Sequence, residues 1–333
     1  MSKKDNSAAK MKKTSIGGQA LVEGVMMKGV STGAMAVRKT DGSLHVEQWE
    51  LPEKKWYNKA PFIRGCVNFI SQLKDGMRCI SKSADLSGLE DDDGEPSKFD
   101  MWLEKTFGKK GAEAITSACA VILMVLMYGV LLFAFLYLPT LLFTLIEGAV
   151  EADISIWKAP FEGVFKILVF ILYMAIVAQM KSMKRMYSYH GAEHKTIACY
   201  ESGKELTIEN VRPMSRFHPR CGTSFILITL IISIVVYMVV PIEPAEWWGI
   251  ENKALGILLR VVIKLPFLPV IVGIAYEFTK LAGRYTNVLT KILTAPGMWL
   301  QRLTTNEPDD SMIEAAIAAI KPCLPRDGEN DNW

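Results

Sequence analysis

Three of the four histidines in this 333-residue sequence, His190, His194 and His218, lie close together in the chain, and Cys221 follows them. Residues four apart on a helix lie on one face, so His190 and His194 can share one metal ion. The later pair, spaced as His-x2-Cys, could complete the site. Imidazole nitrogens and a thiolate suit Zn²⁺, so the pattern predicts a site for zinc or another divalent metal at these four residues.

The string from His190 to His194 also reads His-x-x-Glu-His, which is the reversed zincin motif. In that motif the histidines hold zinc, and the glutamate is the general base toward a zinc-activated water. Glu193 is therefore the candidate catalytic residue. The candidates for a third ligand are His218, Cys221, Glu277 and Glu23. A motif of this length also arises by chance, and the alternative is that its histidines make ordinary hydrogen bonds at helix ends.

The composition points to a membrane protein. Half of the residues are hydrophobic and 22% are charged, and a mean hydropathy of +0.20 is high for a soluble chain with this much charge. A transmembrane helix needs about 20 mostly apolar residues. Four windows meet that length: residues 118–146, 161–180, 224–242 and 255–276. The fourth carries Arg260 and Lys264, so a buried or re-entrant helix is the alternative there.

Basic residues are concentrated on one side of these spans. The connection 181–222 is rich in Lys and Arg, whereas the connections 147–159 and 243–254 carry mainly acidic residues. Cytoplasmic loops hold the excess of basic residues. We therefore expect a multi-pass protein of a bacterial cytoplasmic membrane, with 181–222 and both termini in the cytoplasm. The six cysteines show no CxxC spacing and should be reduced thiols.

Residues 14–60 are predicted to form a small β-rich cytoplasmic domain. An Asp41-Gly42 pair lies between two β-prone runs, which is a hairpin signal. The glycine-rich run 16–29 contains neither GxxxxGK[ST] nor GxGxxG, so it is not a phosphate loop. Glu23 interrupts this apolar run, and it is either a solvent-facing acid on a strand or an acid aimed into a site.

Residues 61–83 are predicted to form an amphipathic helix, because apolar residues recur at helical spacing with basic residues beside them. Such a helix suits the surface of the inner leaflet, and a helix packed on its own domain is the equal alternative. Around it we expect a disordered tail at 1–13 and an acidic linker at 84–100. A membrane domain follows at 101–322, and 323–333 is a polar tail.

The membrane domain ends in predicted cytoplasmic helices. After the fourth span we expect a helix over 277–303, interrupted at Pro296. A short helix over 310–320 would be capped by Asp310 or Ser311. The fold class is thus a polytopic α-helical membrane protein, with about four transmembrane helices and a small β-rich N-terminal cytoplasmic domain.

Three longer strings carry a resemblance to one family. They are Gly17-Gly-Gln-Ala-Leu-Val-Glu-Gly-Val-Met-Met-Lys-Gly29, His190-Gly-Ala-Glu-His-Lys-Thr196 and His218-Pro-Arg-Cys-Gly-Thr-Ser-Phe225. Over about residues 14–322 the sequence resembles the YqhQ-like family of uncharacterised bacterial membrane proteins. Such proteins have been labelled predicted metal-dependent enzymes from these same motifs. The resemblance carries over the motif residues Glu23, His190, Glu193, His194, His218 and Cys221.

Three functions fit these features. The first is a membrane-anchored metal-dependent hydrolase, in which three protein ligands leave a position for water. The second is a non-enzymatic membrane scaffold or adaptor, in which four ligands close a structural zinc site and the β-rich domain binds a protein or peptide partner in the cytoplasm. The third and less favoured is a transporter, with Arg260 and Lys264 along its path. The lipid bilayer is the expected partner in each, and a net charge of +3 gives no reason to expect nucleic acid.

Overall fold

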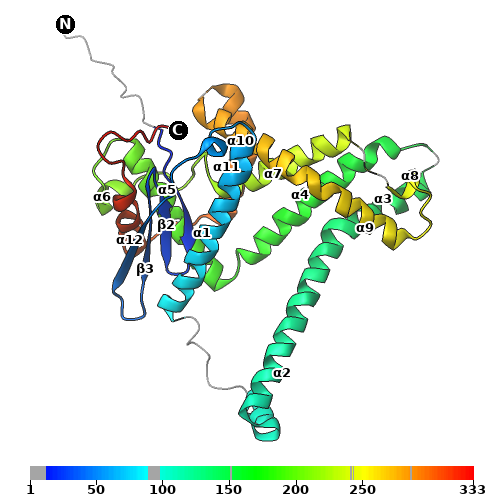
Figure 1. Ribbon diagram of the computed structural model, residues 1–333, viewed down its shortest axis with the longest axis horizontal. Helices are drawn as coiled ribbons and strands as arrows, with labels where there is room; N and C mark the ends of the chain where they lie inside the picture. The colour runs from blue at the N-terminus through cyan, green and yellow to red at the C-terminus, as the bar shows by residue number, and fades with distance from the viewer. Residues whose placement is uncertain (1–12, 89–97, 151, 241, 243, 286) are drawn as a thin grey trace. The chain divides into compact units, whose positions relative to one another are not determined.

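The computed structural model describes residues 13–88, 98–150, 152–240, 242, 244–285 and 287–333. The chain divides into two compact units (Figure 1). The first unit comprises Met1–Gly88, Tyr173–Ile232 and Pro266–Trp333, and the second comprises Leu89–Leu172 and Ser233–Leu265. The predicted disordered tail and most of the predicted acidic linker lie outside the described residues.

The first unit contains a four-stranded antiparallel sheet in the order β1-β2-β3-β4. Its strands are β1 (Gly17–Leu21), β2 (Gly24–Lys28), β3 (Thr32–Arg38) and β4 (Leu44–Glu50). The turn before β4 is the predicted hairpin, in which the backbone N–H of Ser43 donates to the Asp41 carboxylate over 2.8 Å. Gly42 takes a φ of +80°, a left-handed conformation that glycine adopts without strain. The prediction of a β-rich N-terminal region is confirmed.

The remaining chain is almost entirely helical. The first unit holds α1 (Ile63–Ser87), α5 (Lys181–Glu201), α6 (Ile208–Val211), α10 (Leu268–Arg284), α11 (Val288–Thr304) and α12 (Asp310–Ile320). The second holds α2 (Lys98–Leu132), α3 (Leu138–Ala149), α8 (Pro244–Trp247) and α9 (Lys253–Lys264). Two further helices, α4 (Lys158–Val177) and α7 (Gly222–Val239), contain residues of both units.

Helices cover both faces of the sheet. Because successive side chains of a strand point to opposite faces, Val25 and Ala36 pack in one apolar cluster with α5 and α12. Met26 and Met35 pack in another, with Cys79 of α1. Figure 1 shows α1 on one side of the sheet and α12 on the other. The sheet therefore holds α5 and α1 in fixed positions around its first strand, where the candidate site lies.

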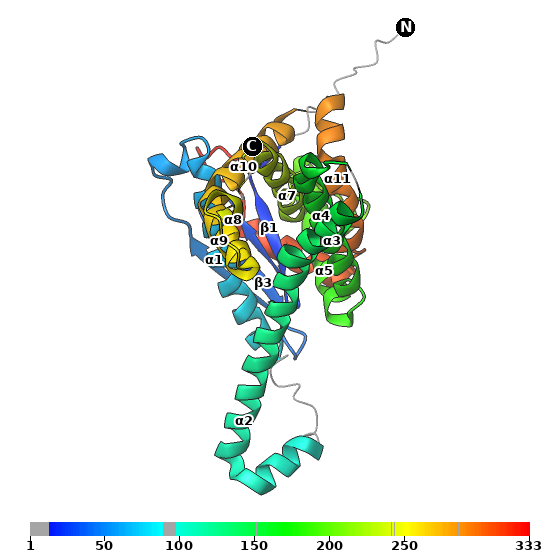
Figure 2. The ribbon, with the colours of Figure 1, turned by 90° about the vertical axis from the view of Figure 1, so that its right-hand side faces the viewer.

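Four helical segments among the described residues are long and apolar enough to cross a membrane, and they overlap the four predicted windows. They are Ala114–Ala149, Lys158–Val177, Gly222–Val239 and Leu258–Arg284. The first consists of most of α2, a π-helical turn and α3. Figure 2 shows α2 bending near its start, where Gly108 has a φ of +70° and breaks the helical path.

Three predicted boundaries differ from the structure. The amphipathic helix continues past residue 83 to Ser87. The helix predicted over 277–303 is interrupted between α10 and α11 and not at Pro296, which lies inside α11. A new helix starts after Asn287 because its side chain accepts a hydrogen bond from the Thr290 backbone N–H over 2.8 Å. The cap of α12 is neither Asp310 nor Ser311. It is Asp309, whose carboxylate accepts the Met312 backbone N–H over 3.0 Å.

Candidate metal centre

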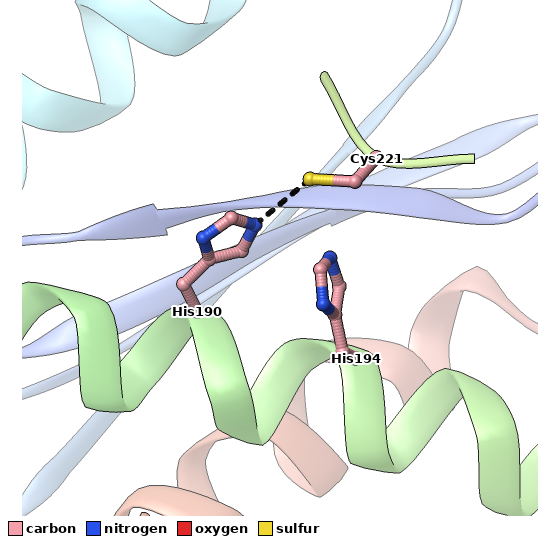
Figure 3. Close-up of side chains that lie close together, drawn as sticks. All are labelled: His190, His194 and Cys221. Atoms are coloured by element: carbon pink, nitrogen blue, oxygen red, sulfur yellow. Dashed lines mark hydrogen bonds between the residues drawn. The ribbon is translucent and has the colours of Figure 1, made fainter. Parts of the chain in front are cut away.

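The candidate metal centre is built on the buried middle of α5. Tyr189 and Ala192 pack in the core between the sheet and α12, which fixes the rotation of the helix. His190 and His194 then lie one turn apart on the face that meets Cys221, as Figure 3 shows. The cysteine comes from the residue immediately before α7. Helix α5 thus supplies two of the three side chains, and the connection that leads into α7 supplies the third.

The donor atoms of these three residues converge. One donor atom from each of His190, His194 and Cys221 lies within 4.8 Å of the other two. The Nε2 atom of His190 is 3.2 Å from the Sγ atom of Cys221, and the two imidazole rings are 4.4 Å apart between centroids. Two imidazoles and a thiolate form a donor set that zinc prefers.

Backbone carbonyls orient both histidine rings. The Nδ1 atom of His190 is 2.7 Å from the carbonyl oxygen of Thr304, and that of His194 is 2.6 Å from the carbonyl oxygen of Arg216. A carbonyl oxygen only accepts hydrogen bonds, so each Nδ1 carries a proton and donates it. This leaves each Nε2 atom as the one able to bind a metal. Metal-binding histidines in proteins are held by the same kind of second hydrogen bond.

The electrostatics favour a thiolate at Cys221. Burial opposes ionisation, but the neighbouring imidazoles of His190 and His194 place the pKa of the Cys221 thiol well below its usual range. Burial likewise disfavours a charged His190, yet the charge and hydrogen bond of Cys221 raise the pKa of His190 to about 9. These two shifts favour an imidazolium–thiolate pair, in which the His190 Nε2–H donates to the Cys221 Sγ atom. A metal ion in this position would replace that proton.

Glu193 lies on the same stretch of α5 and is 4% exposed. The backbone N–H of Gly18 in β1 donates to its carboxylate, and the Oε2 atom has no hydrogen-bond partner among the described residues. Burial raises the pKa of this carboxyl, and the nearby histidines offset part of the effect. A Cβ atom on Gly18 would lie 3.0 Å from the Glu193 Cδ atom and 2.8 Å from the Met27 Sδ atom. The nearest atom to such a Cβ would be the backbone oxygen of Met26 in β2, so glycine is required here first by the pairing of β1 with β2.

A cavity of about 350 Å³ reaches this cluster. Its walls include His190, Glu193, His194, His218 and Cys221, together with the start of β1, the end of β2 and polar side chains of α1. The cavity makes the cluster accessible to a small molecule or to one or two residues of a chain. Sites of this size with a few convergent polar groups are the usual form of ligand-binding pockets.

His218, a predicted ligand, is directed to different partners. Its Nε2 atom is 3.6 Å from the Glu201 carboxylate and accepts a hydrogen bond from Arg220 over 3.2 Å. Its ring centroid is 5.5 Å from that of His194. Glu201 was not among the predicted site residues, although it lies two turns beyond His194 on the same helix and that spacing could have indicated it.

The two acidic candidates for a third ligand lie elsewhere. Glu23 occupies the turn between β1 and β2 with a φ of +50°, and its carboxylate binds Arg185 and accepts the Tyr189 hydroxyl over 3.2 Å. It is neither a mid-strand residue nor a wall of the cavity. Glu277 forms an ion pair with the guanidinium of Arg64. Neither carboxylate is brought together with the histidines.

The basic residues of the fourth span also have partners. Arg260 donates to both carboxylate oxygens of Glu162 over 3.1 and 3.2 Å, and Thr140 donates to the same carboxylate over 2.9 Å. The ammonium of Lys264 lies 4.6 Å from the ring centroid of Tyr237. All of these residues belong to the second unit. Both charges therefore have partners within the protein, and the transporter hypothesis stays a prediction.

Comparisons with known proteins give a family but no activity. The family described as "Protein of unknown function (DUF1385)" matches residues 60–326. A relative named "Uncharacterized protein YqhQ", from Bacillus subtilis (strain 168), is 35% identical over 314 residues, which is 92% of each chain. No solved structure matches the chain. The resemblance indicated by the three motif strings is confirmed.

Proposed function

This chain belongs to the DUF1385 family of YqhQ-like proteins, and we propose that it is a membrane-anchored metal-dependent hydrolase. His190, His194 and Cys221 would hold a zinc or similar divalent ion, and Glu193 would be the general base. The observation that carries this proposal is the convergence of three metal-binding donor atoms beside a buried carboxylate oxygen that has no hydrogen-bond partner among the described residues.

The number of donors favours catalysis over a purely structural role. Three protein ligands leave a coordination position open, whereas structural zinc sites close with four. His218 is the nearest candidate for a fourth ligand, but Glu201 and Arg220 already engage its ring. The cavity gives a small molecule access to the open side of the cluster.

Each residue around the cluster has a separate role in the proposed hydrolysis. A divalent ion bound there supplies Lewis acidity. Glu193 accepts a proton from the attacking water and returns it to the leaving group, and a raised carboxyl pKa suits that exchange near neutral pH. The Gly18 N–H orients the Glu193 carboxylate. The carbonyls of Thr304 and Arg216 keep both imidazole rings in place while the chemistry proceeds.

We further propose that the site lies in the cytoplasm. The connection that carries it is rich in Lys and Arg, and such connections remain on the cytoplasmic side of a bacterial membrane. A reducing compartment also keeps the Cys221 thiolate available for a metal. The substrate would then be a cytoplasmic or membrane-surface molecule with a hydrolysable bond.

Metal content is the direct test. The purified full-length protein should contain about one zinc or similar ion per chain, measured by elemental analysis after dialysis against metal-free buffer. His194→Ala should abolish it, because it removes one of three donors. His218→Ala is the matched control and should retain the ion, since this ring is engaged by Glu201. Metal-free wild-type protein would refute the proposal.

Cobalt substitution separates a catalytic centre from a structural one. If the ion has an open position, adding azide should change the visible absorption of the Co²⁺ protein, and Glu193→Gln should retain the metal. A spectrum that azide leaves unchanged would indicate a closed site. Loss of metal from His218→Ala as well would assign the fourth position to that ring and favour the scaffold function.

A further inference from the structure

Helix α1 has an apolar face that is exposed to the surroundings. Ile70 and Met77 are each 64% exposed, Leu73 is 52% exposed and Ile63 is 47% exposed. Their spacing of three, four and seven residues places them on one stripe of the helix. Side chains of this size are rarely exposed in a contiguous row on a soluble surface without a partner. We call these four residues the α1 stripe.

Another side of α1 packs against α10, a helix of the candidate span Leu258–Arg284. A Cβ atom on Gly65 would lie 2.6 Å from the Tyr276 Cβ atom and 3.2 Å from the Gly273 Cα atom. Asn68 donates from its side-chain amide to the Tyr276 hydroxyl over 2.8 Å. Small residues at a crossing point are a common way for membrane helices to approach each other closely. The first half of α1 therefore lies alongside residues inside the span.

A second candidate span touches the same part of α1. The rings of Phe69 and Phe225 are 5.9 Å apart between centroids, and Phe225 is in the first turn of α7. Two packed helices share the same depth at their contact. If α10 and α7 are surrounded by lipid where they contact α1, the exposed face of α1 must contact lipid as well.

The charges on α1 are distributed as in helices that lie in a membrane surface. Lys74 is exposed and lies next to the second half of the stripe. Arg78, four residues later, is exposed too, but its guanidinium lies 4.4 Å from the ring centroid of Trp49 in β4. The first half, near α10, has only Arg64, which is paired with Glu277. Basic side chains beside an apolar face attract anionic lipid headgroups. The helix is thus more apolar at its beginning and more charged farther along, where Asp75 is paired with Lys28 and Lys82 with Glu47.

The polar side of α1 belongs to the candidate metal centre. Asn68, Ser71 and Gln72 line its cavity. Helix α1 therefore lies between the cavity on one side and the surroundings of the α1 stripe on the other. If lipid contacts the stripe, the cavity lies directly beneath the membrane surface.

We propose that α1 is a membrane-embedded element in addition to the four candidate spans. It lies in the surface of one leaflet, with the α1 stripe among the acyl chains and with Lys74 at the headgroups. It holds the cavity of the metal centre at the lipid boundary. The inference depends on membrane insertion of the spans, but not on the metal or on hydrolysis.

Nitroxide labels on α1 test this placement. The full-length protein is reconstituted in bilayers containing phosphatidylglycerol, with the two accessible thiols removed by Cys66→Ala and Cys119→Ala. Single labels are attached at Ile70→Cys and Met77→Cys. Electron paramagnetic resonance then compares collisions with oxygen, which partitions into lipid, and with a nickel chelate, which remains in water.

Two labels away from α1 calibrate the result. Leu172→Cys on α4 should report lipid, because Leu172 is exposed within a candidate span, and Ser202→Cys after α5 should report water. Labels at 70 and 77 should resemble the label at 172, with at least several-fold less nickel access than at 202.

Three results would overturn the proposal. Nickel access at 70 and 77 equal to that at 202, with 172 still in lipid, would place the stripe in water. Low access to both reagents would show that protein covers the stripe, as in contact with a second copy. Water access at 172 as well would refute insertion of the spans, independently of any metal measurement.

Discussion

Both histidines of the candidate metal centre are fixed by a contact that a metal would not use. The Nδ1 atoms of His190 and His194 donate to backbone carbonyls, so the rings cannot rotate away without losing buried hydrogen bonds. The Glu193 carboxylate is held by the Gly18 N–H. Such preorganisation matters because a site displaced by about 1 Å loses much of its activity.

Two adjacent glycines provide a matched residue-scale test. Gly18→Ala should lower the free energy of unfolding by about 1–3 kcal/mol, as overpacking does, because its Cβ atom would press on the Met26 backbone oxygen and on the side chains of Met27 and Glu193. Gly17→Ala should change it by less than about 0.5 kcal/mol, as substitutions without a structural role do, since no atom lies within 4 Å of its Cβ position. Thermal unfolding in detergent measures both. Equal effects would contradict this account of Gly18.

At the scale of elements, the position of α5 depends on α12. Both helices cover the same face of the sheet, and α12 packs Ala315, Ala316 and Ala319 into the cluster that buries Tyr189. Small alanine side chains let the helices approach closely, which leaves little tolerance for movement. A weaker α12 should therefore loosen α5 and the histidines on it.

The cap of α12 is testable with neighbouring acids. Asp309→Ala should lower stability by about 1 kcal/mol, the usual effect of losing a helix N-cap. Asp310→Ala should have a smaller effect, because its ion pair with Arg212 is more than half exposed. Thermal unfolding of both variants decides between the two caps. A larger loss from Asp310→Ala would support the cap predicted from the sequence.

The contribution of Asp309 should also depend on pH. Burial would raise the pKa of its carboxyl, but hydrogen bonds from Ser311 and Met312 lower it below the ordinary value of 3.8. A carboxyl with a lowered pKa in the folded state stabilises the fold above its unfolded pKa. That contribution is lost as pH falls through the folded value. The stability difference between the wild type and Asp309→Ala should therefore shrink below about pH 4, and a constant difference would contradict it.

At the scale of the whole molecule, the distribution of charge predicts how the chain lies in the membrane. Glu251→Cys, in an acidic connection between candidate spans, should react with a membrane-impermeant maleimide on intact cells. Ser202→Cys, at the end of α5, should react only after lysis. Both positions are exposed in the structure, so burial would not explain a negative result. The reverse pattern would refute a cytoplasmic metal centre.

Much of this protein could be predicted from its sequence because the signals are local. The apolar windows correspond to the four span-length helices, since length and hydropathy are properties of a single segment. The spacing of His190, Glu193 and His194 predicted their proximity, because helical geometry alone brings residues three and four apart together. The Asp41-Gly42 hairpin is likewise encoded by adjacent residues.

Tertiary structure alone decided which distant residues join the histidines. Cys221 meets His190 because the start of α7 passes over α5, whereas His218, three residues earlier, turns to Glu201. Glu23 and Glu277 were plausible ligands by type, but each lies beside an arginine that binds it. Local spacing specifies contacts within one helix. Contacts between segments depend on packing in three dimensions, because a partly buried carboxylate is stable only where packing brings a partner to it.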